Sequence, residues 1–442
     1  MRKTTGQEAE AYLLEIPRFT SKNRVQDTAD FLEVLGNPQN NQKIVHVAGT
    51  NGKGSVCAYL CSVLTEAGYR VGMFTSPHLE TMRERFRIGG ETVEEECFAA
   101  AFDTVMEHLD QARKKVGRED YHPTFFEFLF LMGMIIFREK ETEYLILETG
   151  LGGRLDATNA IESPLLTVIT GIGLDHMEYL GETLEEIAME KAGILKPGVP
   201  VVYCDKKQEA SRVIRNRAEM LGNRAVAVGK EAVERVACGK KGIDFSVYSR
   251  YYGYIDLHLP TRALYQAENA GIALKCVEEL DRGCRITREQ LVRGLTAMYW
   301  PGRMEEIAPG MFLDGAHNED GIEALCHTAG SDGCTGRRLL LFAVAADKAY
   351  SKMIRRLAES GLFHHVVVTG MESSRAAAAE VLFREFRGAA AEIVPDCTCT
   401  AEAAEGLALL QKEKREEDYV YIAGSLYLVG EIKTLLRRST GD

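Results

Sequence analysis

A glycine-rich loop that directly follows an apolar segment is the part of this sequence best suited to chemistry. The apolar segment spans 43–48 and is predicted to be a buried strand. The residues of the loop are Gly49, Thr50, Asn51, Gly52, Lys53, Gly54 and Ser55. Glycines allow the backbone to approach an anion closely, and the helix predicted after the loop adds free N–H groups and the positive end of its dipole. The pattern predicts a phosphate-binding loop in which Lys53 supplies a positive charge.

This loop differs from the standard P-loop pattern at two positions. The pattern requires a glycine five residues before Gly52, where this chain has Val47, and a serine or threonine directly after Lys53, where it has Gly54. Ser55 stands one position further on. The loop is thus a variant of the Walker A motif, and the alternative is a glycine-rich turn that binds no ligand.

Two acidic residues and a histidine have side chains that can hold a metal ion. Glu148 ends an apolar segment at 144–147, and strand carboxyl ends form the ligand-binding edge of a nucleotide-binding sheet. A carboxylate there can hold Mg²⁺, which bridges ATP phosphates; alternatively, it caps the glycine-rich turn that follows. His176 is either a ligand or a structural histidine. Asp175 beside it is either a ligand itself or the partner that orients the imidazole.

Three basic residues outside the loop have both a chemical and a structural interpretation. Lys191 lies in a helix predicted to begin near Thr183 and, on its own, is a solvated lysine on the helix surface. Arg303 follows a Pro-Gly turn and can either donate two hydrogen bonds to a phosphate or form a salt bridge between domains. His317 lies near a predicted strand end, where it lines a site or forms a cap, and we assign it no role.

Alternating apolar segments and helical patterns position these residues. Strands are predicted at 43–48, 70–74, 144–147, 165–170 and 199–203, and helices at about 52–67, 94–116 and 124–140. Short apolar strands separated by helices are typical of a mostly parallel sheet covered by helices on both faces. Aromatic and polar residues alternate from Gly242 to Leu259, which predicts a hairpin or a small antiparallel extension.

A second α/β unit is predicted to begin after the Pro-Gly turn. We divide the chain into a P-loop-type domain at 1–298, a linker at 299–303 and a smaller Rossmann-like domain at 304–442. Strands of the second domain are predicted at 311–314, 339–344, 365–369, 391–394 and 419–422. The chain is therefore expected to be an α/β protein with two main sheets.

The composition fits a two-domain protein and argues against several classes of partner. At 442 residues the chain exceeds what one hydrophobic core usually serves. Its 53 Lys and Arg against 65 Asp and Glu give a net charge of −12, whereas a nucleic-acid or anionic-membrane surface requires a basic excess. The apolar stretch 125–137 is too short to span a bilayer. The 11 cysteines form no zinc or disulfide framework, so we expect reduced thiols in a cytoplasmic protein. The polar residues that follow the first five predict no secretory signal. We also expect a monomer.

The segment 46–55 resembles the ATP loop of folylpolyglutamate synthases and dihydrofolate synthases, which are members of the Mur ligase superfamily. Further segments match this family in order along the chain. They are 75–79 with 83–85, 148–159, 174–176, 190–194, 300–303, 314–318 and 424–427. The chain departs from the family where Glu319 stands in place of the usual proline, and at 345–349, which matches the family's pattern only loosely.

The resemblance implies ATP-dependent ligation of L-glutamate to a folate or pteroate carboxylate through an acyl phosphate. It implies magnesium ligands at Ser76, Glu148 and His176, and a second magnesium site that a carbamylated Lys191 helps to form. It also implies nucleotide contacts for Asn269, Arg303 and Asp314 in addition to the loop. Lys53, Lys191 and His176 are the catalytic residues that it implies.

The resemblance places the pterin-binding positions in two segments. These positions are Thr124, Phe125, Phe126, Glu127, Leu155, Asp156 and Ala157. From their residue type alone, Phe125 and Phe126 fit either a flat heterocycle or plain hydrophobic core.

Three other functions share parts of this pattern. A Mur-type ligase that acts on a cell-wall precursor or another carboxylate has the same loop, but usually carries an extra N-terminal domain, for which about 45 residues leave no room. A non-catalytic ATP-binding switch protein would bind ATP without releasing phosphate when glutamate is added. A kinase would need a site for a hydroxyl substrate, and no such signature is evident.

Overall fold

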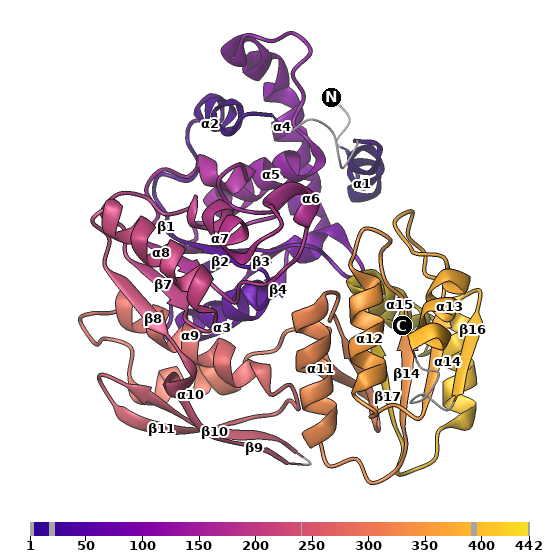
Figure 1. Cartoon of the computed structure of the whole chain (residues 1–442). Helices are drawn as coiled ribbons and strands as arrows, with labels where there is room; N and C mark the ends of the chain where they lie inside the picture. Colours follow the sequence, from indigo (N-terminus) through magenta and orange to yellow (C-terminus); the bar gives the residue numbers. More distant parts are fainter. Residues whose placement is uncertain (1–3, 17–22, 240, 390–395, 441–442) are drawn as a thin grey trace.

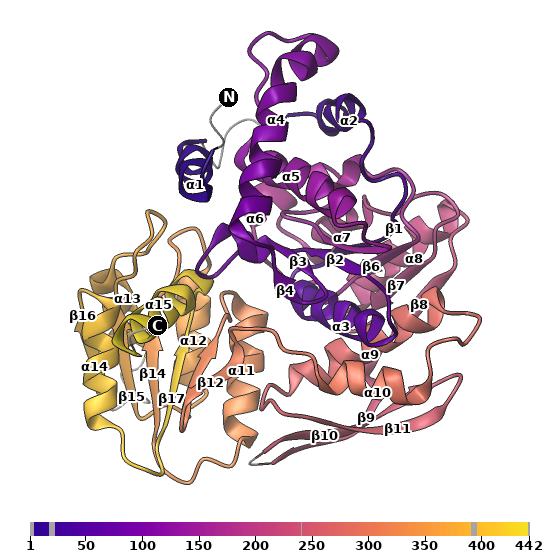
Figure 2. The ribbon, with the colours of Figure 1, turned by 180° about the vertical axis from the view of Figure 1, so that it is seen from behind.

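Two large β-sheets, each with its own helices, lie side by side in the computed structural model, which describes residues 4–16, 23–239, 241–389 and 396–440 (Figure 1). The first sheet has eight strands and the other has six, and a three-stranded sheet lies near the first. The carboxyl-terminal sheet and its helices form a separate lobe in both the front and the back view (Figure 2). The predicted fold class, a large mostly parallel sheet followed by a smaller Rossmann-like one, is confirmed.

The eight-stranded sheet has the order β4-β3-β2-β5-β1-β6-β7-β8. Its strands are β1 (Lys43–Ala48), β2 (Val71–Phe74), β3 (Phe86–Ile88), β4 (Glu91–Thr92), β5 (Tyr144–Glu148), β6 (Leu166–Ile169), β7 (Val201–Cys204) and β8 (Ala225–Val228). In this spatial order, each pair of neighbouring strands from β2 through β5, β1, β6 and β7 to β8 is parallel. Strands β3 and β4 add an antiparallel edge next to β2. Val47 pairs with Glu148, so the ends of β1 and β5 lie next to each other.

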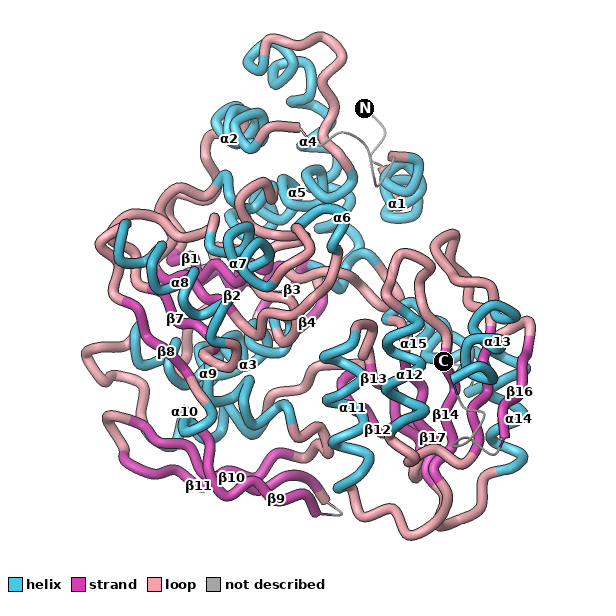
Figure 3. Tube along the Cα trace, viewed as in Figure 1, coloured by secondary structure: helices cyan, strands magenta, loops and turns pink. Residues whose placement is uncertain are grey.

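Helices cover both faces of this sheet because alternate residues of each strand are apolar on both sides (Figure 3). Ile44 and Leu147 belong to one core, and Val45 and Ile146 to the opposite one. The helices of this part are α1 (Gly6–Glu15), α2 (Val25–Val34), α3 (Lys53–Glu66), α4 (Glu95–Val116), α5 (Phe125–Glu139), α6 (Met177–Leu180), α7 (Leu184–Ala192), α8 (Gln208–Met220), α9 (Tyr265–Leu280) and α10 (Arg288–Thr296).

Helices α1 and α2 precede the first strand and are absent from the sequence-based prediction. Helix α1 begins with a capping box between Thr5 and Glu8 and buries Ala9 and Leu13. With only one short apolar stripe, it depends on packing against the rest of the chain more than on its own pattern. Helix α5, by contrast, is buried along its length as expected. Within the described part of the chain, no helix is both long enough and apolar enough to cross a membrane.

The predicted hairpin is the core of the three-stranded antiparallel sheet. Its strands are β10 (Gly242–Ser249) and β11 (Gly253–Leu259), and β9 (Val233–Gly239) pairs with β10 as an additional strand. Most side chains of β9 are exposed, so the strand lacks the apolar alternation that would have predicted it.

The six-stranded sheet has the order β12-β13-β17-β14-β15-β16 and is parallel except for β12. Its strands are β12 (Arg303–Ala308), β13 (Met311–Asp314), β14 (Arg338–Phe342), β15 (His365–Thr369), β16 (Asp396–Thr400) and β17 (Tyr419–Ala423). Its helices are α11 (Glu319–Ser331), α12 (Tyr350–Glu359), α13 (Ala379–Ala389), α14 (Ala403–Glu413) and α15 (Leu426–Thr440). The strand predicted at 391–394 lies entirely outside the described residues. The domain boundaries at 298 and 304 stay a prediction.

Candidate active site

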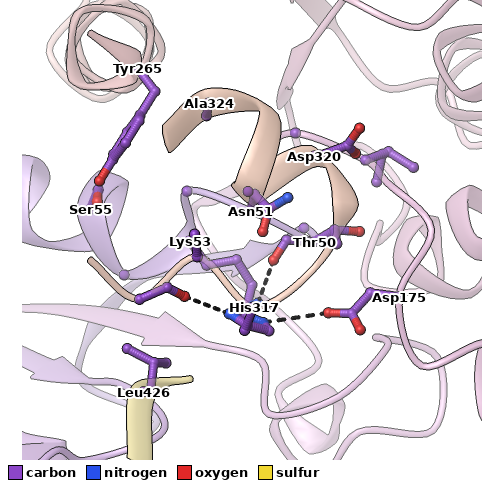
Figure 4. A pocket seen from close by; sticks show the side chains of 18 of the residues that line it. Thr50, Asn51, Lys53, Ser55, Asp175, Tyr265, His317, Asp320, Ala324 and Leu426 are labelled. Atoms are coloured by element: carbon purple, nitrogen blue, oxygen red, sulfur yellow. Dashed lines mark hydrogen bonds and ion pairs between the residues drawn. The ribbon is translucent and has the colours of Figure 1, made fainter. Parts of the chain in front are cut away.

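A large cleft of about 1740 Å³ lies where the eight-stranded sheet faces the carboxyl-terminal lobe. All residues predicted for the site line this cleft: Gly49, Thr50, Asn51, Gly52, Lys53, Gly54, Ser55, Ser76, Thr124, Phe125, Phe126, Glu127, Glu148, Leu155, Asp156, Ala157, His176, Lys191, Asn269, Arg303 and Asp314. Figure 4 shows part of it, with Asn51 and Lys53 of the loop near Asp175 and His317. The structure therefore brings together residues from segments spread over more than half of the chain.

The glycine loop connects β1 to α3, and its glycines are required by its backbone. Gly52 has φ +89° and caps α3 in the left-handed region, and a Cβ there would lie 2.5 Å from Oδ1 of Asn269. A Cβ on Gly49 would lie 1.9 Å from Oγ1 of Thr170. Neither position can carry a side chain without displacing a neighbour, so the backbone stays bare at the amino end of α3. This is the arrangement in which helix N–H groups bind a phosphate.

Glu148 is a buried carboxylate next to this loop. Its Oε2 accepts a hydrogen bond of 3.0 Å from the backbone N–H of Ser76, and its Oε1 lies 3.9 Å from Nζ of Lys53. Burial raises the pKa of Glu148, which the nearby charge of Lys53 partly offsets. The loop after the neighbouring strand β2 thus holds this carboxylate, rather than the turn that follows it.

The oxygens of Glu148 and Ser76 fit a magnesium ion that is also bound to phosphate oxygens, because Mg²⁺ takes few protein ligands in such sites. Within the described residues, no group of three or more His, Cys, Asp or Glu side chains forms a metal site by itself.

His176 has a left-handed backbone conformation with φ +51° directly before α6. Burial lowers the pKa of this imidazole to about 4, so the ring is neutral near pH 7. Its Nε2 lies 3.3 Å from Nζ of Lys348 and accepts from that ammonium. The neighbouring carboxylate of Asp175 lies 4.0 Å from Nε2 of His176. Asp175 accepts a 2.9 Å hydrogen bond from the backbone N–H of His176 rather than from its ring.

The carboxyl-terminal lobe supplies the partners of Asp175. Nζ of Lys348 lies 2.5 Å from its Oδ1, and Nδ2 of Asn318 donates to its Oδ2 over 3.2 Å. His317 is also close, with Nε2 3.5 Å from Oδ2. Burial opposes the charge of Asp175, but hydrogen bonding to His317 and the charges of His317 and Lys348 outweigh it and hold the pKa below its usual range. Asp175 therefore joins the two lobes more than it orients His176.

A second contact joins the glycine loop directly to the carboxyl-terminal lobe. The side-chain amides of Asn51 and Asn318 exchange two hydrogen bonds, of 3.1 and 3.0 Å. Asn318 also caps α11, since its Oδ1 accepts from the N–H of Gly321. The start of α11 is thus tied to the amino end of α3.

The interpretation of Lys191 as a solvated surface lysine is wrong. The side chain is 4% exposed, and its Nζ donates a 2.8 Å hydrogen bond to the carbonyl oxygen of Gly49. It lies on the same face of α7 as the buried Ile187 and Ala188, which pack against the sheet. Burial, aided by the charge of Lys53, lowers the pKa of Lys191 to about 7.

The positions predicted to bind nucleotide are linked by hydrogen bonds around α9 and β13. Nδ2 of Asn269 donates to Gln266, whose Nε2 donates to Oγ of Ser55 in the loop. Asp314 accepts from the hydroxyl of Tyr265 over 2.6 Å. Burial raises the pKa of Asp314, and the charge of Arg303, its neighbour across β12 and β13, acts in the opposite direction.

The predicted pterin-binding residues form another part of the cleft wall. Phe125 is buried beneath the guanidinium of Arg85, whose carbon lies 5.6 Å from the ring centre. The ring of Phe126 occupies the space beside Gly150, where a Cβ would lie 2.6 Å from the ring. Thr124 and Glu127 form the capping box of α5, so these two residues have structural bonds besides facing the cleft. Phe125 is therefore part of the core and part of the cleft wall at once.

Comparison with known proteins identifies the family. The Mur ligase middle domain model matches residues 47–277, and the Mur ligase glutamate ligase domain model matches residues 302–426. The Bacillus subtilis dihydrofolate synthase/folylpolyglutamate synthase is 34% identical over 98% of this chain and 100% of its own. This chain is a Mur ligase of the folylpolyglutamate synthase and dihydrofolate synthase family.

Solved structures agree with this Mur ligase fold over the whole chain. The Mycobacterium tuberculosis folylpolyglutamate synthase complexed with ADP has a TM-score of 0.89 at 26% identity, covering 97% of this chain and 98% of the other. The E. coli FolC in complex with DHPP and ADP has a TM-score of 0.84 at 26% identity and covers 99% of each chain. The predicted family and the class of ATP-dependent ligase are confirmed, which sets aside the switch and kinase alternatives.

Four further residues of this Mur ligase line the cleft but had no predicted role. They are Arg85, Tyr265, His317 and Lys348. Arg85 lies in a segment that matches the family, and Tyr265 lies four residues before Asn269, a predicted nucleotide contact. Lys348 lies in the segment that matches the family only loosely. It contacts Asp175, which lies 173 positions earlier in the sequence, and no local pattern reveals a contact over that separation.

The burial of Lys191 predicts a pH-dependent stability. Its pKa is about 7 in the fold, below its ordinary value of 10.5, so between these values the unfolded chain binds a proton that the folded chain does not. In carbon-dioxide-free buffer, wild-type stability relative to Lys191→Met should therefore fall as the pH decreases toward 7, by up to ~1.4 kcal/mol per pH unit, and level off below it. Urea unfolding at several pH values measures this difference. Lys352→Met, at an exposed site on α12, is the control. The prediction is contradicted if the stability difference between wild type and Lys191→Met is as independent of pH as the difference between wild type and Lys352→Met.

Proposed function

We propose that this ligase joins L-glutamate to the carboxylate of a folate or of pteroate, with ATP as the source of energy. The names of its relatives support this reaction, since the Bacillus subtilis protein is a dihydrofolate synthase/folylpolyglutamate synthase and the E. coli protein has DHPP and ADP bound. The observation that carries the proposal is a single cleft lined by both the phosphate-type loop and the aromatic wall. A phosphoryl donor and a flat acceptor can meet there.

The chemistry follows from which groups surround the loop. ATP places its triphosphate on the loop from Gly49 to Ser55, and the acceptor carboxylate attacks the γ-phosphorus to form an acyl phosphate and ADP. Lys53 and Arg303 neutralise charge on the transferred phosphoryl group, which is the main requirement of such transfers. The α-amine of L-glutamate then attacks the acyl carbon, an amide bond forms and phosphate leaves. Asn269 and Asp314 also contact the nucleotide.

Magnesium is the ion that these residues suit. Ser76, Glu148 and neutral His176 would hold it on the phosphate side of the cleft, where bound Mg²⁺ would offset negative charge on the phosphates. Lys191 contributes to a second magnesium site when its amine carries a carbamate. Its burial beside Gly49 supports this, because only a neutral amine reacts with carbon dioxide and burial favours the neutral form.

The two lobes keep water from the acyl phosphate by closing on the cleft. The contacts from Asp175 and Asn51 to Asn318 lie at that closure. The division into domains at 1–298 and 304–442, with a linker at 299–303, is part of this proposal. We expect the enzyme to work as a cytoplasmic monomer on small molecules.

The acceptor is tested by measuring ATP-dependent glutamate ligation with dihydropteroate and with a tetrahydrofolate side by side. We expect product with at least one of them. Activity with neither, but with another carboxylate, would favour a Mur-type ligase with a different substrate.

Lys53→Ala tests the phosphoryl-transfer step. We expect glutamate-dependent ADP formation to fall by about 10²- to 10³-fold, as for the loss of one preorganised charge at a transition state. Lys352→Ala, on the exposed side of α12, should keep the wild-type rate. A folded Lys53→Ala variant with full activity would falsify the proposed position of the γ-phosphate.

Carbon-13 NMR after exposure to labelled bicarbonate tests the carbamate on Lys191. At a pH above about 7 the wild type should show a carbamate carbonyl signal, because the amine is then neutral. The signal should be missing in Lys191→Ala and retained in Lys352→Ala. A wild-type spectrum without the signal excludes the modification under these conditions.

A further inference from the structure

A buried chain of hydrogen bonds runs from β1 to the acceptor side of the cleft. Nε2 of His46 lies 2.8 Å from Oγ1 of Thr158, and that hydroxyl donates a 2.6 Å hydrogen bond to Oδ1 of Asp156. His46 and Thr158 are fully buried, and Asp156 is 3% exposed. The proposed reaction assigns no function to His46 or Thr158.

The single proton of the Thr158 hydroxyl fixes the direction of this chain. Since the hydroxyl donates to Asp156, it must accept from His46, so Nε2 of His46 carries the proton. The other ring nitrogen, Nδ1, is then unprotonated and carries a lone pair. It is buried without a hydrogen-bond partner among the described residues. Burial lowers the pKa of His46 to about 3, which keeps the ring neutral. His46 thus acts as a fixed donor.

The chain ends on the residue that organises the cleft wall. Oδ1 of Asp156 also accepts from the backbone N–H of Thr158, and Oδ2 accepts from the N–H of Leu151. The carboxylate therefore closes the loop from Leu151 to Thr158, whose members Leu155 and Ala157 line the cleft on either side of it. The position of this wall depends on the orientation of one carboxylate.

His46 connects that wall to the nucleotide side. It lies on β1, three residues before Gly49, on the same strand face as Ala48. Strand β1 is held in register between β5 and β6, so the ring is a rigid support. The same strand carries the glycine loop at its end and supports the acceptor wall from its side.

We propose that His46 and Thr158 are positioning residues that hold Asp156 and the wall at 155–157 for the flat heterocycle of the acceptor, without touching it. The proposal rests on the proposed function, because it assumes that this wall binds the acceptor. It assigns the two buried residues to acceptor affinity rather than to ATP binding.

Thr158→Val removes the hydroxyl and keeps the shape of the side chain. We expect the KM for the acceptor to rise about five- to tenfold, the effect of losing one hydrogen bond, while the KM for ATP stays within about twofold. Thr158→Ser restores the hydroxyl and should return the acceptor KM to near the wild-type value. The matched control is Thr167→Val, a buried threonine on β6 whose hydroxyl donates to Pro200 away from the cleft.

His46→Leu and His46→Gln test the donor. The leucine variant lacks an N–H and should raise the acceptor KM, whereas the glutamine variant keeps an N–H and should raise it less. Thermal unfolding of each variant reports its folding. If His46→Leu does not fold, the comparison of Thr158→Val with Thr158→Ser decides.

Two results would overturn the inference while the proposed function stands. One is an active Thr158→Val enzyme with an unchanged acceptor KM, and the other is an equal rise of both KM values that Thr167→Val reproduces. A wild type that ligates glutamate to neither pterin acceptor would instead overturn the proposed function, and the inference with it.

Discussion

The parallel arrangement of the first sheet is the constraint on which the site depends. Strands β1, β2, β5 and β6 run in the same direction, so the loops that follow them meet at one edge. The glycine loop, Ser76, Glu148 and the segment up to His176 come from four separate parts of the chain and reach the cleft for this reason. The register of β1 with β5 places the residue that ends β5 beside the strand that carries the loop.

Buried acidic and basic side chains lie next to each other at this edge of the sheet, and their proximity affects their pKa values. Glu148 is next to Lys53, and Asp175 is next to Lys348. Lys191 forms no ion pair with a carboxylate among the described residues and instead donates to a backbone carbonyl oxygen, and burial is the largest influence on its pKa. Asp175 is therefore held ionised, whereas the amine of Lys191 is held close to neutrality. Carbamate formation needs such a neutral amine.

Much of this arrangement could be predicted because local patterns in the sequence indicate it. The strands β1, β2 and β5 are short apolar segments, and the loop after β1 has an anion-binding composition. What could not be predicted depends on contacts between distant segments. The burial of Lys191 follows from the packing of α7 on the sheet, and the partners of Asp175 come from the other lobe. Strand β9 and helices α1 and α2 lack a strong period of their own and take their structure from their neighbours.

The second lobe completes the site through polar contacts. Asn318 is the best example, because its side chain caps α11, pairs with Asn51 of the glycine loop and donates to Asp175. One amide thus couples the start of a helix in one lobe to the start of α3 in the other. Hydrogen bonds of this kind depend strongly on distance and angle, whereas apolar contacts tolerate sliding. A movement of the lobes that separates these amides would release the glycine loop from its partner, so the geometry of the loop and the closure of the cleft are linked.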